Sequence, residues 1–451
     1  MNIIFSALLF LILVGAVLCT NFDFIHPAVI FSGLWFVSSC LYLFMAEQWR
    51  MPCDMKTVAL VVPCNLLCVA VMIFSSKLSV KVGASSSGQT NVAGKLMRVF
   101  RITGRRKEKE KWKRRFLVVL LATFYAVSTY MMFTRISELA SMVSQYTDSE
   151  NELYMARIAE VNGHGYGRLY INLMRLNIAL GIVLAKRAAD MIYNREKGYA
   201  LYLPFLLYAV FFSIIRGSRN DLMYILGAYM FIFIFYVYKH SSSRKKALKK
   251  AFRFLLIFAV GIVVMWGLSG IFFSRVGDSA VSSAIGYIGG PLAALNHLLQ
   301  HSEIIDSAYF GQNTFNAVYQ VLSGLEMLSF KPASVYLPYS GNFIFKTNVY
   351  SMYGRYFSDF GVLGCIILTS IFGCFYGFIY GVICRIRKEK IAHRLILIYA
   401  ACMYGLLMSF FEDTFYRTLP NTIYILLFVL AVDYLLFSGG HRLSLSWNRN
   451  H

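Results

Sequence analysis

The sequence has few acidic residues and no polar block long enough to form a soluble catalytic domain. Asp and Glu together number 22 against 44 Lys and Arg, and only 15% of the 451 residues are charged. Hydrophobic residues make up 58% of the chain and recur in runs of membrane length. This composition excludes a soluble enzyme. It predicts an all-α, polytopic helical integral membrane protein with one multi-pass domain over residues 1–451.

Motifs for nucleotide and metal chemistry are absent as well. The sequence contains no GxGxxG or phosphate-loop pattern, no His/Cys cluster at metal-ligand spacing, and no paired acids of the DxD type in an outer loop. Eight of the nine cysteines lie inside apolar runs, where Cys behaves as a small hydrophobic residue. We therefore expect no metal site, no cofactor and no disulfide.

Apolar runs of membrane length predict about eleven transmembrane helices. No internal repeat relates them, which argues weakly against the repeat-built plan of many transporters. The runs lie at 3–19, 28–46, 57–75, 116–134, 169–186, 199–215, 222–238, 254–273, 361–384, 395–411 and 422–438.

Basic residues are concentrated in particular loops. Residues 76–115 contain thirteen Lys/Arg against two acids, and residues 239–253 contain seven against none. The positive-inside rule places both loops in the cytoplasm, with the N-terminus outside and the C-terminus inside. Arg50 and Lys56 disagree locally, because this topology puts their loop outside. We attribute the net charge of +22 to binding of anionic membrane lipids, and expect no nucleic-acid partner.

The block 275–360 is the largest extracytoplasmic loop in this topology, with four Lys/Arg against five acids. Apolar residues recur at helical spacing over 315–328, after the cap-like pair Asn313 and Thr314, and predict an amphipathic helix lying flat at the membrane interface. Residues 289–299 predict a second short helix, interfacial or re-entrant. The many aromatic residues of the block suit either anchoring at lipid headgroups or a platform for sugar rings. The candidates for glycan contact are Tyr350, Tyr353 and Tyr356.

Several arginines stand at the predicted outer ends of the spans, against the charge bias of the chain. Arg216 and Arg219 flank Gly217 at a hairpin tip, so their guanidiniums can converge on one multiply charged anion such as a diphosphate. The alternative interpretation is ordinary interfacial arginines that reach the headgroups. Because partly buried arginines cost desolvation energy, we expect an anion beside them. The candidates for diphosphate binding are Arg216, Arg219, Arg275, Arg417 and Arg355.

Transfer of a sugar to a hydroxyl requires a base near the acceptor oxygen and positive charge near the leaving phosphate, which arginines can supply without a metal. Beside Arg417, one acid can pair with the guanidinium while its neighbour stays free, and the nearby positive charge should lower the pKa of the carboxylate. Asp359 lies four residues after Arg355 and is also explained by an i,i+4 ion pair, and His297 by packing within its helix. The base candidates, in order, are Glu412, Asp413, Asp359 and His297.

Part of the chain resembles a known family. The tip Ile-Ile-Arg-Gly-Ser-Arg-Asn at 214–220, Arg275 outside the next pair of spans, and above all the stretch 347–364 with its Asp-Phe-Gly are similar to the Wzy-type oligosaccharide repeat-unit polymerases of bacterial O-antigen and capsule synthesis. The resemblance covers roughly residues 200–430 and includes the tip from Glu412 to Arg417. The first 130 residues match only in topology.

The resemblance implies an inner-membrane enzyme of GT-C-like helical architecture whose active site faces the periplasm. Its substrates would be oligosaccharides linked to undecaprenyl diphosphate, and its partners a flippase and a chain-length co-polymerase. The growing glycan would pass from undecaprenyl diphosphate to a sugar hydroxyl of the incoming repeat unit. Two alternatives remain open. An O-antigen ligase uses the same donor, and a flippase would place its charges along a central cavity, whereas here they gather at one membrane face.

Overall fold

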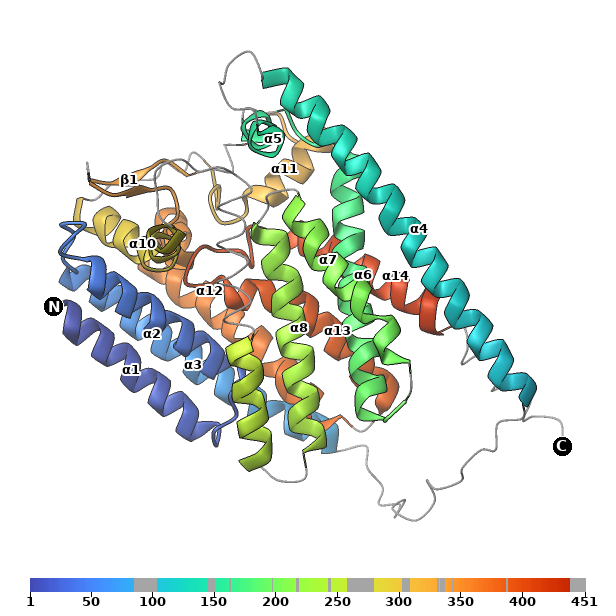
Figure 1. Ribbon diagram of the computed structural model, residues 1–451. Coiled ribbons are helices and arrows are strands. Elements are labelled where there is room, and N and C mark those ends of the chain that lie inside the picture. Colours follow the sequence, from blue (N-terminus) through green and yellow to red (C-terminus); the bar gives the residue numbers. More distant parts are fainter. Residues whose placement is uncertain are drawn as a thin grey trace. The chain divides into compact units, whose positions relative to one another are not determined.

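The protein is predominantly helical (Figure 1). The computed structural model describes residues 1–84, 104–143, 151–161, 164–196, 198–215, 219–241, 245–257, 280–301, 309–330, 332, 337–342, 344–386 and 388–438. The named elements are α1 (Asn2–Cys19), α2 (Pro27–Met45), α3 (Met55–Ala84), α4 (Gly104–Val143), α5 (Glu152–Val161), α6 (Arg168–Tyr193), η2 (Tyr199–Leu201), α7 (Leu203–Ile215), α8 (Arg219–His240), α10 (Ala280–His301), α11 (Asn316–Gly324), β1 (Ser340–Gly341), β2 (Lys346–Thr347), α12 (Ser351–Arg385), α13 (Glu389–Leu407), α14 (Leu419–Asp433) and η3 (Tyr434–Ser438).

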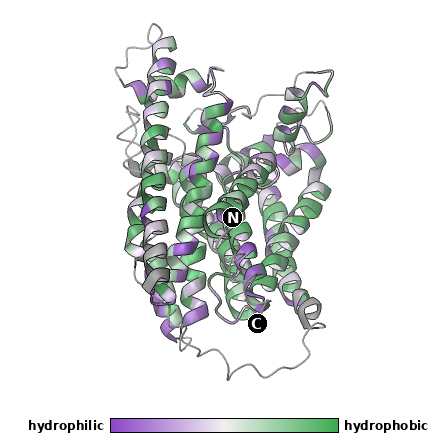
Figure 2. Cartoon of the chain, turned by 90° about the vertical axis from the view of Figure 1, so that its right-hand side faces the viewer, coloured by the Kyte–Doolittle hydropathy of each residue, from purple (hydrophilic) through white to green (hydrophobic). Residues whose placement is uncertain are grey.

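Within the described residues, nine helices are long and apolar enough to cross a membrane. They correspond to nine of the predicted runs, which confirms an all-α, polytopic membrane protein. Hydrophobic residues cover most of the helices in Figure 2. The run at 199–215 forms a shorter apolar helical stretch, and the run at 254–273 is described only as far as residue 257.

The chain forms two compact units. Unit 1 comprises residues 1–80, 226–271 and 275–427, and unit 2 comprises residues 81–225, 272–274 and 428–451.

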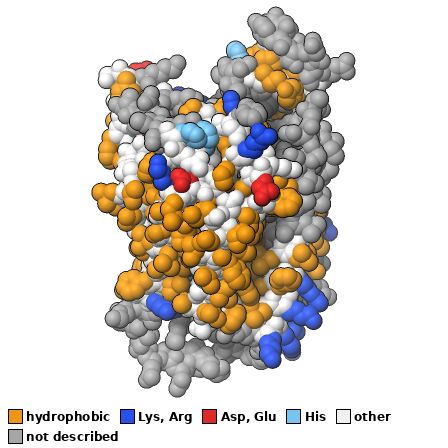
Figure 3. Space-filling view, turned by 90° about the vertical axis from the view of Figure 1, so that its left-hand side faces the viewer, with side chains coloured by type: hydrophobic (Ala, Val, Ile, Leu, Met, Phe, Trp, Pro, Cys, Tyr) orange, Lys and Arg blue, Asp and Glu red, His pale blue; other side chains and the backbone are white. Residues whose placement is uncertain are grey.

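Unit 1 is a bundle in which α2 packs against α1, α10, α12 and α13. The ring of Trp35 on α2 lies 4.9 Å from that of Tyr353 on α12, and both side chains are fully buried. Gly377 lets α12 approach α3 closely, because a Cβ at this position would lie 2.2 Å from the carbonyl oxygen of Met72. On the outside of this bundle α1, α2 and α3 present apolar side chains, and Figure 3 shows a broad hydrophobic surface with charged side chains above and below it.

One end of unit 1 joins the start of α1, the loop between α2 and α3, and the segment from α10 to β2. Asn296 of α10 accepts hydrogen bonds from Asp54 N (2.7 Å) and from Thr57 Oγ1 (2.8 Å). Asn342, in the turn between β1 and β2, donates to the carbonyl oxygen of Trp49 (2.7 Å). We call this the α10 end. Residues 47–56 therefore lie at the same end as the large loop, as the topology requires despite Arg50 and Lys56.

The opposite end of unit 1 joins the α1–α2 loop to the ends of α3, α8 and α12. Tyr380 of α12 donates to Asp23 Oδ2 (2.5 Å), and Arg385 donates to the carbonyl oxygen of Ser76 (2.5 Å). The backbone N–H of Phe24 donates to the hydroxyl of Tyr238 on α8 (3.4 Å). Helices α1, α2 and α3 thus run alternately between the two ends, as consecutive membrane spans do.

The large loop contains more structure than the sequence predicts. Instead of a short helix at 289–299, α10 runs for 22 residues, and its middle is buried against α2, where Ser38 donates to the carbonyl oxygen of Ile288 (2.6 Å). Helix α11 lies inside the predicted 315–328 segment and exposes Val321. Between them and α12, β1 and β2 form a two-residue antiparallel hairpin.

Helix α12 is broken at Gly361, whose φ of 63° and ψ of −156° are not helical. Few residues other than glycine adopt this conformation. The break separates a short first segment, residues 351–360, from the long apolar segment that follows. The predicted span at 361–384 thus begins where the structure breaks the helix, and Arg355 and Asp359 lie on the short segment before it.

Unit 2 contains the charged helix α4 together with α5, α6 and α7. The side chains of Leu139 on α4, Ala156 on α5 and Phe212 on α7 share one buried cluster. Asn177 of α6 donates to the carbonyl oxygen of Ala209 on α7 (3.0 Å), which fixes these two helices against each other.

Candidate functional site

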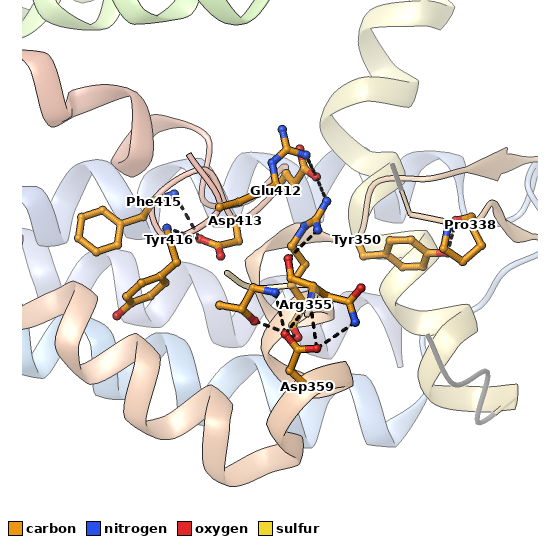
Figure 4. A network of polar contacts seen from close by, with 11 residues as sticks. Pro338, Tyr350, Arg355, Asp359, Glu412, Asp413, Phe415 and Tyr416 are labelled. Atoms are coloured by element: carbon orange, nitrogen blue, oxygen red, sulfur yellow. Dashed lines mark hydrogen bonds and ion pairs between the residues drawn. The ribbon is translucent and has the colours of Figure 1, made fainter. Parts of the chain in front are cut away.

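A cluster of charged side chains lies where the first segment of α12 meets residues 408–418, the loop between α13 and α14 (Figure 4). The backbone holds the two segments together. Ser351 N donates to the carbonyl oxygen of Phe411 (2.9 Å), and Met352 N donates to that of Ser409 (3.1 Å). Arg355 is therefore fixed one helical turn from the loop that carries two acids and an arginine.

Two guanidinium groups meet at one carboxylate oxygen. Arg355 Nη2 lies 2.5 Å from Glu412 Oε1, and Arg417 Nη1 donates to the same oxygen. The Arg355 side chain is only 1% exposed, whereas that of Arg417 is 13% exposed. Burial removes the water that would otherwise solvate these charges. The attraction between the guanidiniums and the carboxylate must therefore offset the free energy lost on desolvation. The cluster combines two positive charges with one closely bound negative charge.

The two adjacent acids have opposite electrostatic environments. Burial by itself would raise the pKa of Glu412, but the guanidiniums of Arg417 and Arg355 outweigh it and lower the pKa below its usual value. Burial raises the pKa of Asp413 to about 7, and its hydrogen bonds reduce this effect only in part. Near neutral pH, Glu412 is therefore ionised and Asp413 exchanges its proton.

Asp413 is bonded through only one of its oxygens. Its Oδ1 accepts hydrogen bonds from Tyr416 N (3.1 Å), Phe415 N (3.2 Å) and the hydroxyl of Tyr356 (3.2 Å). Its Oδ2 is buried and has no hydrogen-bond partner among the described residues. This arrangement matches the expectation that one acid pairs with Arg417 while its neighbour stays available. It favours Asp413 over Glu412 as the group that handles a proton, the reverse of the order expected from the sequence.

The i,i+4 ion pair that was one interpretation of Arg355 and Asp359 is not among the contacts that the structure describes. Arg355 directs its guanidinium to Glu412 and to the carbonyl oxygen of Asn313 (2.8 Å). Asp359 accepts hydrogen bonds from Thr314 N (2.6 Å) and from the side-chain amide of Asn313 (2.9 Å). Asn313 and Thr314 had the pattern of a helix cap, but α11 starts beyond them without a side-chain cap. Asp359 therefore anchors the turn before α11. Its described partners lie 45 and 46 residues away in the sequence, so its spacing of four residues from Arg355 could not predict them.

The three tyrosines expected to contact glycan are buried in this arrangement, which favours a packing role for them. Tyr350, Tyr353 and Tyr356 are at most 1% exposed. Tyr350 donates to the carbonyl oxygen of Pro338 (2.7 Å), and Tyr356 donates to Asp413, as Figure 4 shows for the surroundings of Tyr350 and Asp413. Helical spacing placed these rings on the face that packs into the bundle, where they position the backbone around Arg355 instead of meeting a sugar.

His297 belongs to a different part of unit 1. It lies on α10, where its Nδ1 is 3.1 Å from Ser340 Oγ and its ring stacks on that of His301 with centroids 4.1 Å apart. These contacts join α10 to β1, in keeping with the packing role that was the alternative for this residue. No described contact links His297 to Arg355 or Glu412.

The remaining predicted arginines are not part of the described cluster. Arg216 and Arg275 lie outside the described residues, and Arg219 begins α8 without a described side chain. In the part of the chain that the structure describes, no group of three or more His, Cys, Asp or Glu is arranged to hold a metal ion. Of the five predicted arginines, the structure therefore brings together Arg355 and Arg417.

Comparisons with known proteins add no assignment to this geometry. No protein-family model matches the chain, and neither the curated proteins nor the solved structures contain a match. The function must therefore be argued from the residues themselves.

Proposed function

We propose that the protein is a glycosyltransferase that polymerises oligosaccharide repeat units carried on undecaprenyl diphosphate. The observation that carries this proposal is the convergence of Arg355 and Arg417 on a single carboxylate beside a second, partly bonded acid. Guanidiniums provide the forked donors that bind phosphate oxygens, and a nearby carboxyl whose pKa is about 7 suits proton transfer at neutral pH. The sequence resemblance to Wzy-type polymerases supports the same reaction.

In the proposed reaction, a hydroxyl oxygen of the incoming repeat unit attacks the anomeric carbon of the growing glycan. The bond from that carbon to the diphosphate oxygen breaks, and the diphosphate leaves with the electron pair. The proton of the hydroxyl passes to the base, for which the geometry favours Asp413. Arg355 and Arg417 stabilise the charge that develops on the leaving diphosphate. The resemblance adds Arg216, Arg219 and Arg275 to the same task.

The proposal places the enzyme in a bacterial inner membrane with a GT-C-like architecture. The α10 end of unit 1, which carries the charged cluster, would face the periplasm. The partners would be a flippase that delivers repeat units and a co-polymerase that sets chain length.

The test is polymerisation by the purified full-length protein with lipid-linked repeat units in the presence of EDTA. Wild type should build polymer. Arg417→Lys should reduce turnover about 10²–10³-fold, because a point charge cannot reproduce the forked contact and loss of one such donor has this effect in other enzymes. Asp413→Asn should reduce turnover about 10²–10⁴-fold, the usual contribution of a positioned acid or base.

Arg135→Lys provides a matched control, because Arg135 also pairs with a glutamate, Glu138 (2.8 Å), but on α4 in unit 2. It should retain wild-type turnover. Wild-type turnover by both site variants would overturn the proposal. Transfer only to lipid A–core would indicate a ligase, and movement of repeat units across liposome membranes without glycan transfer would indicate a flippase.

A further inference from the structure

Glu412 occupies the position between two guanidiniums that a phosphate oxygen would suit. Its Oε1 accepts from both Arg355 and Arg417, and the residue is 7% exposed. A carboxylate and a phosphate present oxygens of similar hydrogen-bonding geometry to arginine. The side chain of Arg417 is more exposed than that of Arg355, so an incoming anion would reach Arg417 first.

Several buried polar groups in the loop that carries Glu412 and at the start of α12 have no hydrogen-bond partner among the described residues. Among the described residues, the buried hydroxyls of Ser351, Ser409 and Thr414 have no hydrogen-bond partner, and the same holds for Oδ2 of Asp413. Ser351 also has a φ of 55°, which is uncommon for a residue other than glycine. Buried polar atoms without partners are costly, so this arrangement of the loop leaves hydrogen-bonding capacity unused, while the backbone bonds to the carbonyl oxygens of Phe411 and Ser409 hold the loop to α12.

We propose that Glu412 is an internal substitute for the substrate's diphosphate, and that the diphosphate displaces it from Arg417 and Arg355 when it binds. This inference depends on the proposed function, since it gives Glu412 a part in the same site. It assigns Glu412 the role of a counter-ion that holds the empty site together, in place of the base expected from the sequence.

The charges around the two guanidiniums favour this exchange. Glu412 supplies one negative charge, Asp413 is only partly ionised near neutral pH, and Asp359 directs its oxygens to Asn313 and Thr314. A diphosphate carries more charge and more acceptor oxygens than one carboxylate, so it satisfies both guanidiniums better.

The exchange would also free the acid beside it. Arg355 keeps its bond to the carbonyl oxygen of Asn313 when Glu412 leaves, so the turn before α11 stays attached. Asp413 is 1% exposed in the present arrangement, and release of Glu412 removes the two ion pairs of the residue directly before it. Donor binding would thereby expose the proposed base to the acceptor hydroxyl only when the donor is in place.

The experiment is carboxylate labelling of the purified full-length wild-type protein at pH 7. A carbodiimide and glycine ethyl ester convert accessible carboxylates to amides, which mass spectrometry locates. Inorganic pyrophosphate should raise the labelling of Glu412 several-fold. Asp359 should keep its labelling because its oxygens stay bonded to Asn313 and Thr314, and exposed Glu326 reports reagent activity.

A structural or catalytic Glu412 would behave differently, because bound pyrophosphate would protect it or leave it unchanged. Either result overturns the inference. If Glu412 becomes labelled but the protein does not polymerise lipid-linked units, the proposed function fails and the exchange stands. If polymerisation occurs without a rise in labelling, the exchange fails and the function stands.

A variant gives an independent measurement. Glu412→Gln removes the competing charge, so pyrophosphate should bind about tenfold more tightly than to wild type, which corresponds to about 1.4 kcal/mol. It should also raise the melting temperature of the variant more than that of wild type. Weaker binding to Glu412→Gln than to wild type would contradict the exchange, and the labelling result decides the matter if the variant does not fold.

Discussion

Glu412 and Asp413 are neighbours in the chain and have the same kind of side chain, yet their surroundings give them different properties. Glu412 extends toward Arg355 and Arg417, which stabilise its charge. Asp413 turns into the loop, where Tyr416 N and the Tyr356 hydroxyl bond only Oδ1. A pair of acids whose pKa values are moved in opposite directions is typical of sites that separate a fixed charge from a mobile proton.

The raised pKa of Asp413 predicts a specific dependence of stability on pH. The unfolded chain loses this proton near pH 4, whereas the native state keeps it until about pH 7. Between these values the native state binds more protons, so its stability falls as pH rises, by up to about 1.4 kcal/mol per pH unit. Asp413→Asn removes this dependence. Its melting temperature relative to wild type should therefore increase from pH 5 to pH 8 when both are measured in the same detergent.

The control for this prediction is Asp359→Asn. No described contact of Asp359 is with Arg417, and among its described partners are neutral amides of Asn313 and Thr314. This variant should be destabilised at every pH, since an amide nitrogen in place of one carboxylate oxygen faces donors. Parallel curves for Asp413→Asn and wild type from pH 5 to pH 8 would show that Asp413 titrates normally.

The residues of the candidate site could be identified from the sequence, but which of them pair with one another could not. Arginines and acids in loops between apolar runs identified Arg355, Glu412, Asp413 and Arg417, because charge is unusual there. Pairing depends on which loops meet in space. Arg355 and Glu412 are 57 residues apart in sequence, so helical spacing suggested the nearer Asp359 instead.

At the scale of elements, the break in α12 decides where Arg355 points. Gly361 separates the site segment from the membrane-length segment, and its backbone conformation is one that glycine alone adopts readily. No atom lies within 4 Å of a Cβ built there, so a substitution would act through backbone strain and not through a clash. The apolar run predicted from the sequence, 361–384, begins at the same glycine, whereas the apolar helix as a whole runs from Ser351 to Arg385.

Gly361→Ala tests this role. The strain should cost about 1–3 kcal/mol, so the helix should straighten or the site segment should shift away from Glu412. We expect a lower melting temperature and loss of polymer synthesis at normal protein levels. Gly15→Ala is a matched control, because Gly15 lies inside α1 and a Cβ there also has no neighbour within 4 Å. Wild-type behaviour of Gly361→Ala would show that the break does not position Arg355.

The length of a helix could be predicted from the sequence where the helix is uniformly apolar. It could not be predicted where tertiary contacts determine where the helix begins and ends. The runs that became α1, α2 and α13 were recognised because their hydrophobic residues are continuous. Helix α10 was predicted only over its Ala/Leu-rich stretch, residues 289–299. Packing against α2 and the hydrogen bonds of Asn296 extend it to 22 residues.

At the scale of the whole chain, the hydrogen bonds of unit 1 show which loops share an end, while the distribution of charge predicts which end faces the cytoplasm. Residues 20–26 contact the end of α12, and residues 46–54 contact α10 and the β1–β2 turn. Basic loop 239–253 follows the end of α8 that contacts Phe24. The positive-inside rule then predicts that the α10 end, with Glu412 and Arg417, lies outside.

Reporter fusions test both statements at once. Fusions at Glu47 and Thr418 should give active alkaline phosphatase, which requires the periplasm, whereas fusions at Asp23 and Lys388 should give fluorescent cytoplasmic protein. The fusion at Glu47 is the most stringent test, because the nearby charges of Arg50 and Lys56 alone would predict that this loop lies in the cytoplasm. A cytoplasmic Glu47 together with a cytoplasmic Lys388 would contradict the alternation of α2 and α3 between the two ends. A complete inversion of all four would preserve the alternation and reject the orientation, and with it a periplasmic site.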